Sequence, residues 1–207
     1  MVNRMNDLHN KTLDYYNKNA TEFITASTLT VDFTQTQDHF LKLLPSESFI
    51  LDFGCGSGRD TKYFLSKGYC VDAIDGSEKL VEAASNYTGI EVRHMLFQEL
   101  DEVSKYDGIW ACSSILHLSK EELADVFGRM SVALKSEGIV YTSFKYGEFE
   151  GWRSGRYFTD FTEETFAEFV KNIRTLDVEE CWITNDVRPD KGEEKWLNLI
   201  LRKREVI

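Results

Sequence analysis

The 207-residue chain has little of several features that mark whole classes of protein. It contains only two prolines, so a Pro-rich linker is not expected. No apolar run approaches the roughly 20 residues that a membrane-spanning helix needs. The first ten residues are polar and lack the apolar core of a secretory signal, so we expect neither a membrane span nor a signal peptide.

Basic residues are scarce relative to acidic ones. Lys and Arg total 24 against 35 Asp and Glu, which gives a net charge of -11. Nucleic acids and anionic membrane surfaces are bound chiefly through Lys and Arg, so neither is an expected partner. The four cysteines and four histidines are not arranged at metal-ligand spacing, and we expect no metal and no disulfide framework. A reduced, cytoplasmic setting is the simplest interpretation.

Strand and helix patterns alternate evenly along the chain. This alternation favours an α/β fold with a mostly parallel sheet. The turn chemistry of residues 188–192 joins the last two expected strands as a hairpin, so one strand should be reversed. The expected strands are 48–53, 69–75, 90–94, 106–112, 138–144, 175–184 and 195–203. The expected helices are 7–26, 35–44, 59–67, one that Ser77 caps, 119–134 and 162–172.

The most informative stretch is Gly54-Cys55-Gly56-Ser57-Gly58, where the first expected strand meets a helix. Glycines there let the backbone turn sharply and let a ligand approach it. The nicotinamide pattern G-x-G-x-x-G wants its third glycine one residue later, where this chain has Arg59. Asp52, two residues before the loop, repels a pyrophosphate but suits a cationic amino-acid group. S-adenosylmethionine carries an ammonium, a sulfonium and no phosphate, so it fits better than a dinucleotide.

A second acid, Asp75, ends the next expected strand about 20 residues after Gly54. An acid at this distance in a βαβ unit reaches the ribose hydroxyls of an adenosine ligand. Taken alone, Asp75 would read as a surface acid at a strand end. Together with the glycine loop, it favours the ligand.

On these residues the chain resembles the class I S-adenosylmethionine-dependent methyltransferases, within the small-molecule branch that includes tellurite-resistance-like enzymes. The likeness rests on 51–58, 75–77 and 106–111, and more loosely on 115–118, 143–148 and 156–158. It implies a Rossmann-like, doubly wound sheet of seven strands, mostly parallel with the last antiparallel and with helices on both faces. It also implies one methyltransferase domain over 1–207, with a helical lid segment at 1–46 and the core at 47–207.

The resemblance further implies transfer of a methyl group to a small molecule, with S-adenosylhomocysteine as product. Asp52 would lie beside the donor's amino group, and Asp75 would hold both ribose hydroxyls. Many relatives hold the adenine amine with an Asp that this chain lacks, so Gln98 or a backbone carbonyl must substitute. Tyr16 is equally well explained as a core aromatic. The expected cofactor contacts are Tyr16, Asp52, Gly54, Cys55, Gly56, Asp75, Gly76, Ser77, Leu96, Phe97, Gln98, Ala111 and Cys112.

Residues beyond the fourth and fifth expected strands are candidates for handling the acceptor. His117 is a candidate general base, or else a histidine packed beside the cofactor. The basic residues that follow the fifth strand would hold an anionic substrate, or else pair with nearby acids. The expected substrate contacts are Lys145, Trp152, Arg156 and Tyr157. A nicotinamide-dependent oxidoreductase and a non-catalytic S-adenosylmethionine-binding protein are the alternative functions.

Overall fold

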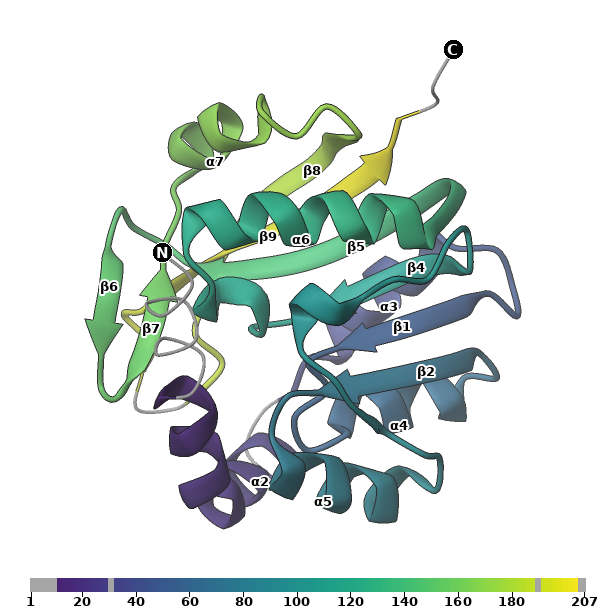
Figure 1. The fold of residues 1–207 in the computed structure, drawn as a ribbon, viewed down its shortest axis with the longest axis vertical. Helices are drawn as coiled ribbons and strands as arrows, with labels where there is room; N and C mark the ends of the chain where they lie inside the picture. The colour runs from purple at the N-terminus through teal and green to yellow at the C-terminus, as the bar shows by residue number, and fades with distance from the viewer. Residues whose placement is uncertain (1–10, 30–31, 189–190, 205–207) are drawn as a thin grey trace.

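The computed structural model describes residues 11–29, 32–188 and 191–204. Its main feature is a seven-stranded sheet in the order β3-β2-β1-β4-β5-β9-β8 (Figure 1). Strand β9 pairs antiparallel with both β5 and β8, while the other pairs are parallel. The strands are β1 (Phe49–Phe53), β2 (Cys70–Asp75), β3 (Arg93–His94), β4 (Tyr106–Ala111), β5 (Leu134–Lys145), β8 (Leu176–Asn185) and β9 (Lys195–Lys203). The expected α/β architecture with a reversed last strand is thereby confirmed.

Helices cover both faces of this sheet. They comprise residues 11–18, α2 (Ala20–Leu29), α3 (Thr34–Lys42), α4 (Arg59–Ser66), α5 (Glu78–Thr88), α6 (Lys120–Ala133) and α7 (Glu163–Val170), with short 3-10 turns η1 (Phe97–Glu99) and η2 (Ile115–His117). Ser77 and Ser119 cap α5 and α6 as expected, since each side chain accepts from a backbone N–H of the first turn. The expected first helix is bent at Asn19, and its residues 7–10 lie outside the described residues.

Alternation along the central strands divides the core into two layers. Leu51, Ile109 and Val140 are fully buried on the face that α6 and α7 cover. Ile50 and Trp110, one position away, are fully buried on the face of α3 and α4. Parallel strands that are buried on both faces read as continuous apolar runs, which is why the sequence pattern of β1 and β4 was informative.

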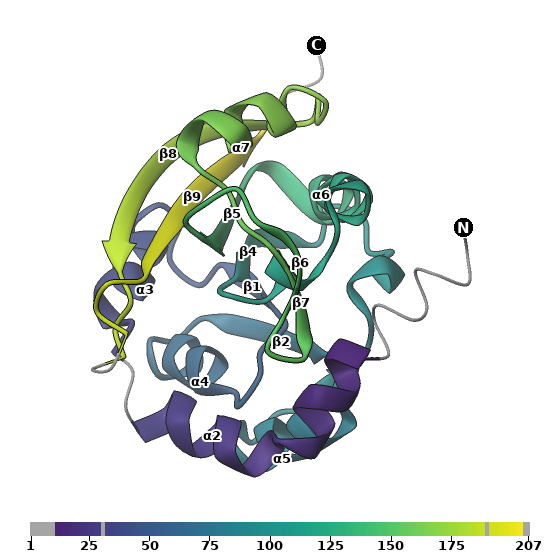
Figure 2. The ribbon, with the colours of Figure 1, turned by 90° about the vertical axis from the view of Figure 1, so that its left-hand side faces the viewer.

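The strand order reverses between β1 and β4, because β1 leads outward to β2 and β4 leads outward to β5. In such sheets ligands bind in the crevice outside the carboxyl ends of the strands at this reversal. Figure 2 looks onto this edge and shows the hairpin of β6 (Glu150–Arg153) and β7 (Arg156–Thr159) in front of it, with α2 and α5 below. The fold thus covers the crevice with segments from both halves of the chain.

The β6–β7 hairpin is absent from the strands expected from the sequence. Ser154 and Gly155 have φ of 51° and 80°. Two successive left-handed residues make a tight turn whose twist suits a hairpin. Two strands also differ clearly in length from the expected ones: β5 is longer, and β3 has only two residues. Within the described part of the chain, no helix has the length and apolar character to cross a membrane.

Candidate active site

The turn between β1 and α4 forms one wall of the main cavity. Gly54 and Gly56 have φ of +87° and +56°, in the left-handed region that favours glycine. A Cβ on Gly54 would lie 2.6 Å from Cβ of Ser114 and 3.0 Å from Cζ of Phe97. The loop therefore needs glycine both for its backbone conformation and for its close packing.

Four of the five backbone N–H groups of this loop, those of Gly54, Cys55, Gly56 and Gly58, donate to groups inside the protein. The N–H groups of Gly54 and Cys55 both donate to the carbonyl of Ile74, at 3.0 and 2.9 Å. The Gly58 N–H donates to the Cys55 carbonyl, and the Gly56 N–H donates to a side chain described next. A pyrophosphate is held by free N–H groups at such a turn. A loop that uses these donors internally does not suit a dinucleotide, which agrees with the sequence argument.

Asp75 joins the glycine loop to helix α5. Its Oδ2 accepts from the Gly56 N–H at 2.9 Å, and its Oδ1 accepts from the Ser77 N–H at 2.8 Å. Burial raises the pKa of Asp75, and these two N–H groups oppose that rise. The carboxylate lines the cavity, and each oxygen keeps a further lone pair. Asp75 is thus positioned to accept from two hydroxyl groups of a ligand.

Asp52, the other acid of the expected cofactor site, does not line the cavity. It is buried beneath the loop, where its Oδ2 accepts from the Thr61 hydroxyl at 2.5 Å. Burial and the nearby Asp60 carboxylate raise its pKa. Asp52 supports the turn from below, so its contact with a donor amino group remains only a prediction.

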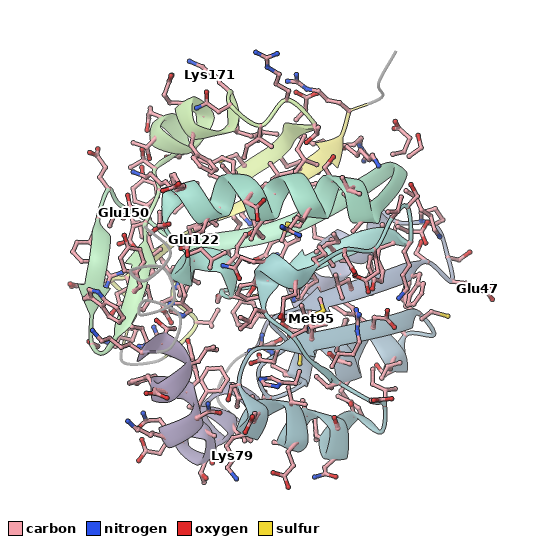
Figure 3. All side chains as sticks on the ribbon, viewed as in Figure 1. Glu47, Lys79, Met95, Glu122, Glu150 and Lys171 are labelled. Carbon is pink, nitrogen blue, oxygen red and sulfur yellow. The ribbon has the colours of Figure 1, made fainter. Side chains whose placement is uncertain are left out.

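The main cavity has a volume of about 470 Å³ and collects most of the expected site residues. Both halves of the chain contribute to it, and Met95, labelled in Figure 3, follows β3 into its wall. The expected residues that line it are Tyr16, Gly54, Cys55, Gly56, Asp75, Gly76, Leu96, Phe97, Gln98, Cys112, His117, Lys145 and Arg156. Those that do not are Asp52, Ser77, Ala111, Trp152 and Tyr157.

His117, Tyr16 and Arg156 meet in one hydrogen-bonded chain. Nδ1 of His117 lies 2.6 Å from the carbonyl oxygen of Tyr157, so Nδ1 carries the proton and donates. Nε2 of His117 then accepts from the Tyr16 hydroxyl at 2.7 Å. Arg156 donates from Nη1 to the same hydroxyl over 3.4 Å. These hydrogen bonds connect the N-terminal helical segment to η2 and to the β6–β7 hairpin.

The register of the hairpin explains why two expected substrate contacts fall outside the cavity. Trp152 pairs with Tyr157, and Arg153 pairs with Arg156. Adjacent strand residues point to opposite faces, so the two arginines lie on one face and the two aromatic residues on the other. Trp152 and Tyr157 pack against each other with ring centroids 5.9 Å apart, and Trp152 is 42% exposed.

The sequence analysis missed several residues of the cavity. Asp60 lies two residues after the glycine stretch, in the first turn of α4, and its carboxylate accepts from Gln37, Arg59 and Trp110. Phe23 on α2 lies against the loop, because a Cβ on Gly56 would be 3.0 Å from its ring. Residues 184–188, at and after the end of β8, also line the cavity. Only Asp60 had a local signal, namely its position in the turn.

A second cavity of about 480 Å³ adjoins the first. The two share Lys145, Arg156, Phe158 and Arg188 in their walls. The shared wall is built from β5, the β6–β7 hairpin and the residues after β8. The crevice therefore has one side against the glycine loop and another that extends toward cationic side chains.

The strand order and this crevice define a Rossmann-like fold of the methyltransferase type. Residues 50–138 match the family model described as "Methyltransferase domain". N-terminal Xaa-Pro-Lys N-methyltransferase 1 of Xenopus tropicalis is 33% identical over 100 residues, which are 44% of this chain and 45% of that protein. The chain spans about half the length of the curated relatives that it matches, 53% and 45% for two of them.

Two solved structures share the fold over nearly the whole chain. The Burkholderia thailandensis 1,6-didemethyltoxoflavin-N1-methyltransferase has a TM-score of 0.81 at 20% identity and covers 97% of this chain and 91% of its own. A TehB-like S-adenosylmethionine-dependent methyltransferase of Corynebacterium glutamicum has a TM-score of 0.69 at 18% identity and covers 92% and 99%. Both likenesses show that the chain shares the fold of these enzymes, and the residues that match the family model lie within it.

Proposed function

We propose that the chain transfers a methyl group from S-adenosylmethionine to a small-molecule acceptor. The proposal rests on two neighbouring features of one cavity wall. One is the glycine loop, in which the N–H groups of Gly54, Cys55, Gly56 and Gly58 donate inside the protein, and the other is the Asp75 carboxylate. Such a site accepts hydrogen bonds from a cationic, hydroxyl-bearing ligand and does not favour phosphate. An oxidoreductase that uses a nicotinamide dinucleotide is not supported by this arrangement.

The residues present fit the donor. Asp75 would hold the ribose hydroxyls, and the Leu96–Gln98 stretch would lie along the adenine. Glycine at positions 54 and 56 lets Ser114, Phe97 and Phe23 pack directly against the loop, since a Cβ there would lie 2.6–3.0 Å from them. When bound, the donor supplies a methyl group that its sulfonium already activates. The protein's task is then to place an acceptor atom in line with that methyl group and to exclude water.

The walls of the crevice suit that task. Tyr16 and Phe23 come from the N-terminal helices, and Phe158 comes from the hairpin, so aromatic rings line the cavity. Cys112 lies at the end of β4, where burial raises the pKa of its thiol to about 12, so the thiol stays protonated and acts as a packing group. The acceptor would enter from the side of the second cavity.

A small acceptor is favoured over a protein. The Burkholderia enzyme, which covers almost this whole chain, is named for a small molecule. The Xenopus relative is named for protein N-termini, but its likeness covers only 44% of this chain. We also propose an anionic group in the acceptor, for the reasons argued below, and a cytoplasmic location, which suits four free thiols.

Two measurements test the proposal. Isothermal calorimetry should detect S-adenosylhomocysteine binding and no comparable binding of NADH. Release of S-adenosylhomocysteine from S-adenosylmethionine is then followed with a library of small acids, phenols, thiols and amines and with an Xaa-Pro-Lys peptide. Preferential NADH binding would refute the donor, turnover with the peptide alone would refute the small acceptor, and binding without any turnover would leave a non-catalytic binding protein.

A further inference from the structure

Three cations line both cavities, and two of them are already neutralised by acids of this chain. Lys145 is paired with Glu194. Arg188 binds Asp186 through Nε at 2.8 Å and Nη2 at 2.5 Å. Arg156 is the exception, because it has no carboxylate partner within the described ranges 11–29, 32–188 and 191–204. Of these three cations, Arg156 is therefore the one whose charge is available to a ligand.

Arg156 is enclosed by aromatic rings. Its guanidinium carbon lies 4.6 Å from the ring centroid of Tyr15, 5.7 Å from that of Tyr16 and 5.1 Å from that of Phe158. Nε is buried and has no hydrogen-bond partner among the described residues. A half-buried guanidinium that lacks an anion is incompletely compensated, and a planar anion would satisfy it by two parallel hydrogen bonds.

His117 is poorly suited to remove a proton from an acceptor. Its Nε2 lone pair is already taken by the Tyr16 hydroxyl at 2.7 Å. Burial, together with Arg156 and Arg153, lowers the pKa of His117 to about 4. An effective general base needs a free lone pair and a pKa near the working pH. His117 instead holds Tyr16 in position.

The carboxylates of the main cavity are committed as well. Asp60 and Asp186 each accept four hydrogen bonds, and Asp75 accepts two from backbone N–H groups. Although burial alone would raise it, the Arg188 contacts lower the pKa of Asp186 to about 2. Glu22 is exposed on α2, at the rim of the cavity.

We propose that the acceptor is methylated on an atom that arrives as an anion, with its charge paired to the guanidinium of Arg156. The inference rests on the methyl-transfer function proposed above and names its substrate class. Such acceptors are carboxylic acids, acidic phenols or enols, and ring N–H groups that ionise near neutral pH. Arg156 is then the specificity-determining residue, and no general base is required.

The transfer balances without a proton. A lone pair of the anionic acceptor atom forms the new bond to the methyl carbon. The bond from that carbon to sulfur breaks, and its electron pair stays on sulfur. The positive charge of the sulfonium and the negative charge of the acceptor cancel, so the products are a neutral thioether and a neutral methylated acceptor group. Arg156 loses its anionic partner in this step, which favours product release.

The test compares acids with their neutral amides on the complex with S-adenosylhomocysteine. Benzoate, nicotinate and phenylacetate are titrated against benzamide, nicotinamide and phenylacetamide by isothermal calorimetry. At least one acid should bind about tenfold or more tightly than its amide, as a charge-assisted hydrogen bond implies. Arg156→Gln should abolish this preference, and Arg156→Lys should retain part of it. Arg153→Gln, which removes a hairpin arginine already held by Asp160, should keep the preference.

The outcomes separate the two proposals. If S-adenosylhomocysteine does not bind the wild-type protein, the methyl-transfer function fails. If it binds but acids bind no better than amides, only the present inference fails. Weaker S-adenosylhomocysteine binding in Arg156→Gln would mean that Arg156 holds the donor's own carboxylate, which also overturns it. With acceptors of different acidity, the midpoint of the kcat/KM pH profile should follow each acceptor's own pKa, and a shared midpoint would contradict the inference.

Discussion

Replacing Asp75 tests the cofactor site most directly. Its two carboxylate oxygens hold the Gly56 and Ser77 N–H groups at 2.9 and 2.8 Å and face the cavity with their remaining lone pairs. Each charge-assisted hydrogen bond lost to a ligand hydroxyl costs about 1.5–3 kcal/mol. Asp75→Asn keeps one oxygen but turns an NH₂ toward a backbone N–H. We therefore expect a loss of about 10- to 100-fold in S-adenosylhomocysteine affinity for Asn, and a larger loss for Ala.

The assay is isothermal calorimetry on variants whose circular dichroism spectrum matches that of the wild type. Asp72 is the matched control, since it lies on the same strand and its carboxylate binds Lys105 and Tyr106 away from the cavity. Asp72→Asn should leave the affinity unchanged. Equal affinities for wild type and Asp75→Asn, or an equal loss in both variants, would refute the assignment of the ribose to Asp75.

Two further predictions concern stability. Gly54→Ala combines a left-handed backbone with a Cβ contact of 2.6 Å, so we expect it to lower the free energy of unfolding by more than about 1 kcal/mol and the Tm by several degrees. In the control Gly128→Ala within α6, the new Cβ meets nothing within 4 Å, so the free energy of unfolding should rise by up to about 1 kcal/mol. Equal melting temperatures for the two variants would contradict this reasoning. Between pH 6.5 and about 4 the unfolded chain binds a proton at His117 that the folded protein does not. The free energy of unfolding should therefore fall by up to about 3 kcal/mol as the pH drops through this window. In urea titrations, the plot of this free energy against pH should be flatter for His117→Gln than for the wild type. Parallel plots would contradict a neutral His117 in the folded protein.

Local patterns were sufficient for the seven strands of the main sheet and for the position of the glycine turn. The alternation of buried strands with capped helices was confirmed, and so was the conformation of the glycine loop, because a left-handed φ needs glycine whatever surrounds it. Asp75 was identifiable since the spacing within a βαβ unit is set by the lengths of one strand and one helix. The β6–β7 hairpin was not predicted, although the dipeptide Ser154-Gly155 is typical of a turn.

The sequence alone was enough to predict the features that depend on neighbouring residues along the chain, namely strand and helix periodicity, helix caps and the glycine turn. Tertiary structure alone decided which side chains are free to act. Tyr16 meets His117 across 101 residues and Arg156 across 140, and Asp52 is buried beneath the loop that it precedes. Lys145 and Arg188 are neutralised by Glu194 and Asp186, whereas Arg156 is left among aromatic rings. The physical reason is that ion pairing and desolvation depend on contacts between distant segments, which no local pattern encodes.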